Sequence, residues 1–582
     1  MNNIPLSEYP RPQFERDSYL CLNGLWNYSV YEDKNLKDSF NENEAMKKGE
    51  ILVPYPIESK LSGVEHLLLP NELLVYEREF DLDESFLRDL CFLHFGAVDH
   101  ECRVFLNNKE LGYHKGGYIA FSFDVTKDIL VGKNHLKVLV TDQTDSKDLI
   151  RGKQKLKPGS IFYTPISGIW QTVWLEAVSK DYVKSIKIDP NIDKKTINLK
   201  LESEAKEVEI AIFDKENEIH RQRYNTKDAI GIDINNPKLW SPEKPFIYQM
   251  EIRTDKDLVK SYFAMRKFSF KKDKKGYMRL ALNNKIYFHN GVLDQGYHQE
   301  GIYTAKNDAE LKKDIELLKE LGFNMARKHV KIEPLRWYYH CDHLGLLVWQ
   351  DLVCGGKRYS YSKKYRDPAY PLKINDKKES VNKIQDLEFR ADFEVSIDET
   401  VDLLYNCPSI CQWTLFNEGW GQFDSNRLTN DLRAKDLTRA IDSTSGWFMQ
   451  KYSQSDFFSK HVYHEKIKIP RSWFFKNKVL VISECGGYGR KIENHQFDPE
   501  KSFGYKLFDT EDSVTQIYED LYNTQIIANI DKGVSACVYT QLSDVEIEVN
   551  GLVTYDRQVF KLDIDRVKAI NAIINNLNTI ER

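Results

Sequence analysis

The sequence predicts a multidomain β plus α/β protein: an N-terminal jelly-roll sandwich, an immunoglobulin-like sandwich and a C-terminal (β/α)8 TIM barrel. Three observations lead to this expectation. The 582 residues are too many for one hydrophobic core. Short alternating apolar runs separated by turn residues fill roughly the first 270 positions. After that point, amphipathic helical segments alternate with short buried strands, which is the pattern of a closed parallel barrel.

We expect residues 1–180 to form the jelly-roll domain. The segments 102–125 and 134–142 alternate apolar and polar residues, and no long helical pattern interrupts them. Asn107 and Asn108 separate two alternating runs, which predicts a hairpin turn. Antiparallel strands with no long helical pattern between them favour a sandwich or jelly roll.

We expect residues 181–272 to form the immunoglobulin-like sandwich and residues 273–582 the barrel. The segment 196–214 repeats the alternating pattern on a smaller scale. In the barrel, Asn307 and Glu310 have capping-box spacing at the start of a helix, and Gly322 follows its end. Helix followed by apolar strand then recurs several times along the chain.

The composition argues against several classes of partner and cofactor. The net charge is −5, with 83 basic and 88 acidic residues, so no surplus of cations predicts nucleic-acid binding. The N-terminus lacks the pattern of a secretory signal, no stretch is long and apolar enough to span a membrane, and nine cysteines without a regular framework suit a reducing compartment. We therefore expect a cytoplasmic protein without membrane contact, cofactor or metal.

Two apolar strands of the predicted barrel end in a glutamate. The segment 409–416 leads into Glu418, and the segment 479–483 leads into Glu484. In a (β/α)8 barrel the chemistry lies at the carboxyl ends of the strands, so these side chains can converge on one ligand. Cleavage of a glycosidic bond requires a pair of carboxyl groups, one to protonate the leaving oxygen and one to attack or to activate water. The alternative for each glutamate alone is an ion pair with a neighbouring cation.

The chain resembles glycoside hydrolase family 2, the family of β-galactosidases, β-glucuronidases and β-mannosidases. The resemblance covers nearly the whole length and rests on seven motifs in the family's order. They are PRPQFERDSYLCLNGLW (10–26), VPYPIESKLSG (53–63), SGIWQTVWLE (167–176), GVLDQGYHQEGIYTA (291–305), FNEGWGQFD (416–424), SECGGYG (483–489) and VYTQLSDVEIEVNGLVTYDR (538–557).

This resemblance implies a retaining double displacement with Glu418 as acid/base and Glu484 as nucleophile. It also implies that Asn417 binds the substrate 2-hydroxyl, that His329 binds a ring hydroxyl and that Tyr463 orients the nucleophile. His329 as a surface loop residue and Tyr463 as a packing residue remain the alternatives. A metal site at His461 and His464 is disfavoured because no carboxylate or cysteine set completes it in the sequence.

Further residues end or follow the expected barrel strands, and each is either a pocket residue or a support for one. They are Asp294, Asp351, Tyr539 and Gln541. The loop Arg151-Gly152-Lys153-Gln154 is a candidate to reach the mouth of the active site from the first domain. Glu418 and Glu484 are 66 positions apart, so the helices after strands 5 and 6 must be short. We place those strands at 445–450 and 460–464.

The expected substrate is an oligosaccharide or glycoside with a neutral sugar at its end, and a β-galactoside is favoured. Members of the family that cleave glucuronides carry an Asn-x-Lys motif that binds the sugar carboxylate. Here Glu548-Val549-Asn550 stands in that place, which disfavours a β-glucuronidase unless another base compensates. β-Mannosidase, α-L-arabinosidase and a catalytically silent carbohydrate-binding protein stay open, as does a homo-oligomer.

Overall fold

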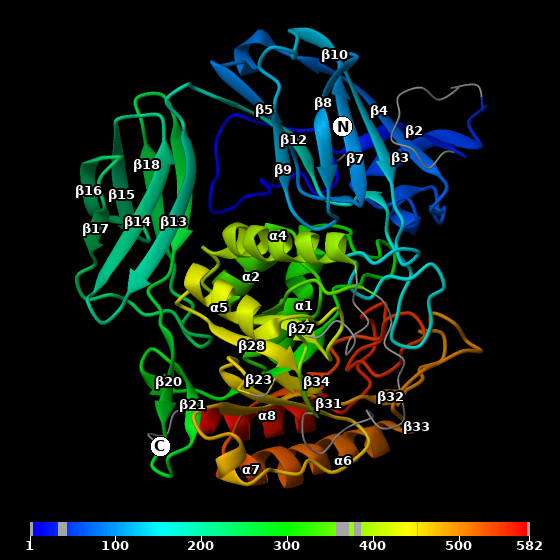
Figure 1. The fold of residues 1–582 in the computed structure, drawn as a ribbon, viewed down its shortest axis with the longest axis vertical. Helices are drawn as coiled ribbons and strands as arrows, with labels where there is room; N and C mark the ends of the chain where they lie inside the picture. Colours follow the sequence, from blue (N-terminus) through cyan, green and yellow to red (C-terminus); the bar gives the residue numbers. More distant parts are fainter. Residues whose placement is uncertain (1–3, 33–43, 357–371, 378–385, 451, 579–582) are drawn as a thin grey trace.

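The computed structural model describes residues 4–32, 44–356, 372–377, 386–450 and 452–578. Figure 1 shows a β-sandwich at the N-terminal end of the chain, a second sandwich beside it, and a layer of strands and helices below both. This arrangement agrees with the predicted order of two sandwiches and a barrel. The boundaries at 180 and 272 stay predictions. Among the described residues, no helix is long and apolar enough to cross a membrane.

The first sandwich contains two antiparallel sheets that enclose one core. One sheet has the order β1 (Tyr19–Cys21), β12 (Val173–Val178), β5 (Leu90–Phe95) and β9 (Phe121–Asp124). The other has the order β3 (Lys47–Val53), β2 (Gly24–Tyr31), β4 (Leu73–Leu82), β10 (Gly132–Thr141), β7 (Glu101–Leu106) and β8 (Lys109–Lys115). Asn107 and Asn108 both have positive φ between β7 and β8, so the predicted hairpin turn is confirmed.

The second sandwich also has two antiparallel sheets. They contain β13 (Val183–Asn191), β14 (Thr196–Ser203) and β17 (Ile230–Asp233), and β16 (Asn217–Asn225), β15 (Glu207–Asp214), β18 (Tyr248–Arg253) and β19 (Leu258–Phe263). A small sheet, β20 (Phe268–Lys272), β21 (Met278–Leu282) and β22 (Lys285–Ile286), follows and packs through Leu280 and Leu282 against the first residues of the barrel strands.

Eight parallel strands form the barrel. In chain order they are β23 (His289–Asp294), β24 (Met325–Lys328), β25 (Leu347–Asp351), β27 (Ile410–Asn417), β28 (Ala440–Ser445), β30 (Phe457–Val462), β31 (Val479–Gly486) and β34 (Val534–Thr540). Neighbours in this order pair in parallel except β28 and β30, and β34 pairs with β23. Between β28 and β30, the Asp456 backbone N–H donates to the Ile441 carbonyl (3.0 Å) and links the two strands.

Helices cover the outside of the barrel. They are α1 (Asp308–Glu320), α2 (Leu335–Leu344), α4 (Leu387–Leu404), α5 (Ser425–Lys435), α6 (Glu511–Leu521), α7 (Ala528–Ile530) and α8 (Ile564–Asn578). The Asn307 side chain accepts from the Glu310 backbone N–H (3.0 Å), which confirms the predicted cap of α1. Within the described residues only a single-turn helix at Ser472–Phe474 lies between β28 and β31, as the short spacing of the two glutamates predicts.

The prediction for strand 5 was wrong. The barrel strand is β28, whereas Phe448–Gln450 form β29, which pairs with β26 (Leu372–Ile374) outside the barrel. The sequence of β28 is polar, and its buried Asp442 accepts hydrogen bonds from Ser455 (3.2 Å), just before β30, and from Ser459 of β30 (3.1 Å). A buried strand whose polar side chains are satisfied by a neighbouring segment carries no apolar signal in the sequence.

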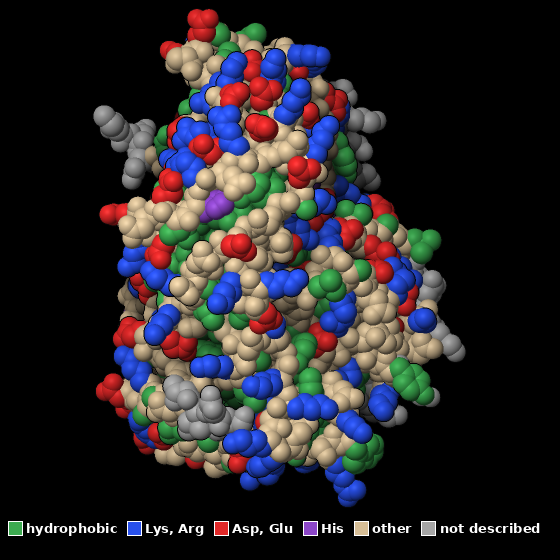
Figure 2. Space-filling model, turned by 90° about the vertical axis from the view of Figure 1, so that its left-hand side faces the viewer, with side chains coloured by type: hydrophobic (Ala, Val, Ile, Leu, Met, Phe, Trp, Pro, Cys, Tyr) green, Lys and Arg blue, Asp and Glu red, His purple; other side chains and the backbone are tan. Residues whose placement is uncertain are grey.

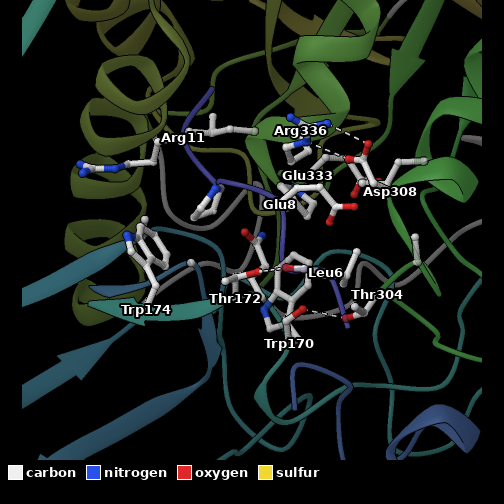
Figure 3. A pocket seen from close by; sticks show the side chains of 18 of the residues that line it. Leu6, Glu8, Arg11, Trp170, Thr172, Trp174, Thr304, Asp308, Glu333 and Arg336 are labelled. Carbon is white, nitrogen blue, oxygen red and sulfur yellow. Dashed lines mark hydrogen bonds and ion pairs between the residues drawn. The ribbon is translucent and has the colours of Figure 1, made fainter. Parts of the chain in front are cut away.

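The N-terminal segment joins the three parts of the molecule. Arg16 forms an ion pair with Asp257 of the second sandwich (2.9 Å) and a weaker one with Glu176 of the first (3.4 Å). The Gln13 side chain donates to the Asn406 carbonyl beyond α4 (2.7 Å). A cavity of about 60 Å³ lies at this junction. Figure 3 shows side chains that line it, among them those of Leu6, Glu8, Trp170, Thr304, Glu333 and Arg336. The N-terminal segment therefore connects both sandwiches and the barrel through side-chain contacts.

The surface carries mixed charge. On the face shown in Figure 2, basic and acidic side chains are interspersed over both the upper sandwich and the lower part of the molecule. This mixture agrees with the small net charge, and on this face it offers no extended basic patch for a polyanion.

Candidate active site

Glu418 and Glu484 lie at the carboxyl ends of β27 and β31 and are both almost fully buried. Glu418 directly follows β27 in a left-handed backbone conformation (φ 50°), and its N–H donates to the Ser445 carbonyl (2.9 Å). A glutamate rarely adopts this conformation, and such residues are typically held in place at functional sites. Because of this turn, the Glu418 side chain does not continue the direction of β27 but lies toward Glu484 of β31.

His461 joins the two glutamates. Its Nδ1 lies 2.8 Å from Oε1 of Glu418 and 3.2 Å from Oε2 of Glu484. One carboxylate oxygen of each glutamate and a ring nitrogen of His461 lie within 4.8 Å of one another. Retaining glycosidases hold their two carboxyl groups about 5–5.5 Å apart, whereas inverting enzymes leave room for a water.

A Cβ at Gly446 would come within 2.7 Å of the His461 ring, so glycine makes space for this histidine.

Arg327 of β24 holds the other side of Glu484. Its NH1 lies 3.0 Å from Glu484 Oε1, its NH2 donates to Asn417 Oδ1 (2.9 Å), and its Nε donates to Asp351 Oδ1 (3.0 Å). Burial raises the pKa of Glu484, and the charges of His461 and Arg327 oppose that shift. The guanidinium thus positions three of the predicted site residues at once.

Tyr463 and His329 also lie in this network. The Tyr463 hydroxyl donates to Glu484 Oε2 (2.5 Å) and contacts the Thr540 hydroxyl (2.9 Å), and its ring stacks on Tyr505. The Nδ1 of His329 lies 2.8 Å from Asp351 Oδ2. Burial lowers the pKa of His329 to about 3, so the imidazole is neutral at ordinary pH.

The structure does not bring three of the predicted residues to the carboxylates. Asp294 forms an ion pair with Lys328 (2.6 Å), and Gln541 donates to Asn550 Oδ1 (2.8 Å). The Tyr539 ring packs against Tyr518 of α6 and Tyr488, on the outer side of the barrel. Asp294 and Gln541 thus support neighbouring loops, and Tyr539 belongs to the packing between strand and helix.

Arg327 and His461 are the functional candidates that the sequence reasoning missed. Arg327 stands two positions before His329, and His461 was considered only as a metal ligand. Arg327 is fully buried, and a buried arginine at the end of a barrel strand requires paired anions. The sequence shows an arginine at the end of the short apolar segment 323–327, whereas it gives no sign that His461 meets both glutamates.

The three domain regions each match a model of one family. Residues 20–178 match the sugar-binding domain of glycosyl hydrolases family 2, residues 171–266 match the model described as glycosyl hydrolases family 2, and residues 274–483 match its TIM barrel domain. The chain belongs to glycoside hydrolase family 2.

Relatives within family 2 carry different activities in their names. A protein from Formosa agariphila, named provisionally as a β-glucuronidase, is 26% identical over 67% of this chain and 46% of its own length. A β-galactosidase from Staphylococcus xylosus is 25% identical over 75% of this chain and 43% of its own. A β-galactosidase from Lactococcus lactis is 25% identical over 84% and 50%. The chain therefore spans about half the length of these relatives.

Solved family 2 structures share the whole fold. A β-D-glucuronidase from Dictyoglomus thermophilum has a TM-score of 0.73 at 17% identity and covers 99% of this chain and 100% of its own. A β-glucuronidase from an uncultured Clostridium species has a TM-score of 0.72 at 18% identity, covering 97% and 98%. At this identity the likeness concerns the fold, and the sugar has to be argued from the residues of the site.

The same cluster is where a cation would bind, if the protein held one. Glu418, His461 and Glu484 offer three ligand atoms within a small space. However, the Arg327 guanidinium lies 3.0 Å from Glu484, and a hydroxyl already donates to the other oxygen of that carboxylate. The guanidinium charge opposes a second cation, so these residues fit a hydrogen-bonded pair of carboxyl groups better than a metal site.

Replacement of Tyr463 by phenylalanine should move the acidic limb of the kcat/KM profile to higher pH. The Tyr463 hydroxyl stabilises the ionised form of Glu484 and so lowers its pKa. Without this hydrogen bond the pKa of Glu484 rises, and activity is lost at a higher pH as the solution is acidified. We also expect kcat/KM at its optimum to fall about 10- to 100-fold, the value of one hydrogen bond to a charged group.

The matched control is Tyr539→Phe, which removes a buried hydroxyl from the adjacent strand without touching Glu484. Its pH profile should coincide with that of the wild type. An unchanged acidic limb in Tyr463→Phe would contradict the assigned contact.

Proposed function

We propose that the chain is a retaining exo-β-glycosidase that hydrolyses terminal neutral β-glycosides, with β-galactosides favoured. The observation that carries the proposal is the close pair of carboxyl groups at Glu418 and Glu484, bridged by His461. Their separation suits direct attack on the anomeric carbon and leaves no room for an intervening water. Membership of a family of glycoside hydrolases supports the same reaction class.

In the first step Glu484 attacks the anomeric carbon while Glu418 gives its proton to the leaving glycosidic oxygen. The bond to the aglycone breaks, and the sugar becomes an ester of Glu484. Arg327 and Tyr463 hold the attacking carboxylate with one hydrogen bond to each oxygen. The nucleophile is therefore oriented before substrate arrives.

In the second step Glu418 takes a proton from water, which attacks the anomeric carbon and releases Glu484. Two inversions give net retention of the β configuration. Asn417 Oδ1 accepts from Arg327, so its amide nitrogen is the group left to donate to the 2-hydroxyl of the sugar. Neutral His329 adds a second polar contact for the ring hydroxyls.

The preference for a neutral sugar rests on the loop after β34. Glu548 stands where a carboxylate-binding group would be needed, and it is buried there with hydrogen bonds from Tyr163 and Asn550. A sugar carboxylate beside this acid would be repelled. Two of the named relatives are β-galactosidases, which supports the favoured glycone.

The proposal is tested by release of 4-nitrophenol from five 4-nitrophenyl glycosides: β-galactoside, β-glucoside, β-mannoside, β-glucuronide and α-L-arabinoside. We expect one neutral glycoside to be hydrolysed fastest, and proton NMR to show the β-anomer of the free sugar as the first product. An α-anomer as first product would contradict the retaining mechanism. Fast cleavage of the glucuronide would overturn the preference for neutral sugars. No turnover of any glycoside would favour a binding protein.

A further inference from the structure

A loop of the first sandwich crosses the open end of the barrel. Gly152 donates its N–H to the Cys354 carbonyl beyond β25 (2.8 Å), and Ile150 forms a bridge with Gly355. Gly152 has φ 61°, and a Cβ there would lie 2.6 Å from the Val330 carbonyl beyond β24. Glycine is therefore required for the backbone to come this close, and the contact fixes the position of the next residue, Lys153.

A second contact anchors the same loop on the opposite side of the barrel mouth. The Tyr163 hydroxyl donates to Glu548, and the Thr164 N–H donates to Glu546 Oε1 (2.7 Å). Asn550 donates to the other oxygen of Glu548 (2.9 Å). The first domain thus reaches both the loops beyond β24 and β25 and the loop beyond β34. Lys153 lies between these two anchors in the chain.

Lys153 is buried beside the aromatic rings of Trp420 and Phe162. Lys153 is only 6% exposed. Its ammonium lies 4.7 Å from the ring centre of Trp420, which stands two positions after Glu418. Among the described residues, no hydrogen bond or ion pair reaches this ammonium. Burial lowers its pKa, and the carboxylates of Glu548, Glu418 and Glu484 oppose that shift.

A lysine side chain this buried, whose ammonium has no hydrogen bond among the described residues, points to a ligand that completes it. The three opposing carboxylates all belong to the site, so the ammonium is within their electrostatic reach at the mouth of the barrel. Arg327 is fully engaged by Glu484, Asp351 and Asn417, which leaves Lys153 as a donor available to substrate. Glu548 has the largest electrostatic effect on Lys153 among these carboxylates.

We propose that Lys153 is a specificity-determining residue: its ammonium donates a hydrogen bond to a hydroxyl of the glycone, and Glu548 balances its charge. The inference rests on the proposed function and adds to it the residue that selects the sugar. Because the charges of Lys153 and Glu548 cancel, the site favours an uncharged sugar over a uronic acid. A cation without this acid would favour a carboxylated sugar instead.

The test measures kcat/KM for the best neutral glycoside of the wild type and for the matching β-uronide. Lys153→Met should lower kcat/KM for the neutral glycoside about 10- to 100-fold, because a charged donor to the substrate is lost. Glu548→Gln leaves the ammonium uncompensated and should raise the ratio of uronide to neutral turnover about 10-fold or more. A role limited to folding would lower both activities together and leave the ratio unchanged.

Two matched controls separate selectivity from docking of the loop. Lys157→Met removes an exposed lysine from the same loop, and Glu546→Gln alters the neighbouring anchor without changing the charge opposite Lys153. Both should keep the wild-type ratio of uronide to neutral turnover within about twofold, which is a smaller change than the loss of one hydrogen bond to a charged group would cause. Unfolding temperatures of all variants, measured by differential scanning fluorimetry, verify that they are folded.

The outcomes distinguish this inference from the proposed function. An active wild type with unchanged activity in folded Lys153→Met overturns the role of Lys153 alone. An unchanged ratio in folded Glu548→Gln overturns the charge balance. A wild type that prefers the uronide overturns the preference for a neutral sugar and the charge balance stated here. A wild type that hydrolyses no glycoside removes the proposed function and this inference together.

Discussion

Replacement of Glu484 by glutamine should reduce kcat/KM by about 10⁴-fold or more, the loss seen when a covalent nucleophile is removed. An amide has nearly the same shape as the carboxylate but cannot form the glycosyl ester at a useful rate. Arg327 and Tyr463, which donate to the Glu484 carboxylate in the wild type, would then face a weaker acceptor. The measurement is steady-state hydrolysis of the best 4-nitrophenyl glycoside of the wild type.

A chemical rescue decides whether the loss reflects the nucleophile. In Glu484→Gly, azide can occupy the vacated space and attack the anomeric carbon once, which gives the α-glycosyl azide by inversion. Glu500→Gln, an exposed glutamate beyond β32 (Tyr488–Arg490), should behave as the wild type. Substantial activity in folded Glu484→Gln would exclude this residue as the nucleophile.

Replacement of Glu418 by glutamine should give a loss that depends on the leaving group. Substrates with a poor leaving group, such as alkyl glycosides, need the proton and should lose about 10²- to 10⁴-fold in kcat/KM. A 2,4-dinitrophenyl glycoside needs little protonation, so its kcat/KM should change much less. Its kcat should still fall, because Glu418 no longer activates the water that releases the glycosyl ester.

Azide gives the contrasting product in this variant. In Glu418→Gly it attacks the glycosyl-enzyme in place of water, and the product is the β-glycosyl azide. The pair of azide products therefore assigns the two roles independently of rate. Equal losses for alkyl and dinitrophenyl glycosides would contradict the assignment of Glu418 as acid/base.

Much of this protein follows from local features of its sequence. The cap of α1 at Asn307 and the hairpin at Asn107 are set by residues a few positions apart, so local chemistry determines them. The eight-strand barrel was predicted from the alternation of helix and strand, and the two glutamates were found because each closes an apolar strand.

The faces of the barrel strands could not be predicted in the same way. Strands in a parallel barrel are buried on both sides and carry no alternating pattern, so the sequence does not tell which side chains point inward. Tyr539 was expected in the pocket and packs outward against α6. The polar strand β28 was missed because its buried Asp442 is satisfied by Ser455 and Ser459, which belong to the segment at β30.

The class of fold, the family resemblance and the two carboxylates that the proposed chemistry needs could all be inferred from the order of the residues. The tertiary structure decided which distant residues complete them: Arg327 and His461 approach Glu484 from two other strands, and Lys153 arrives from a different domain. These contacts join residues tens to hundreds of positions apart. Their cause is the closure of the barrel and the docking of the sandwich upon it, and no local pattern encodes either one.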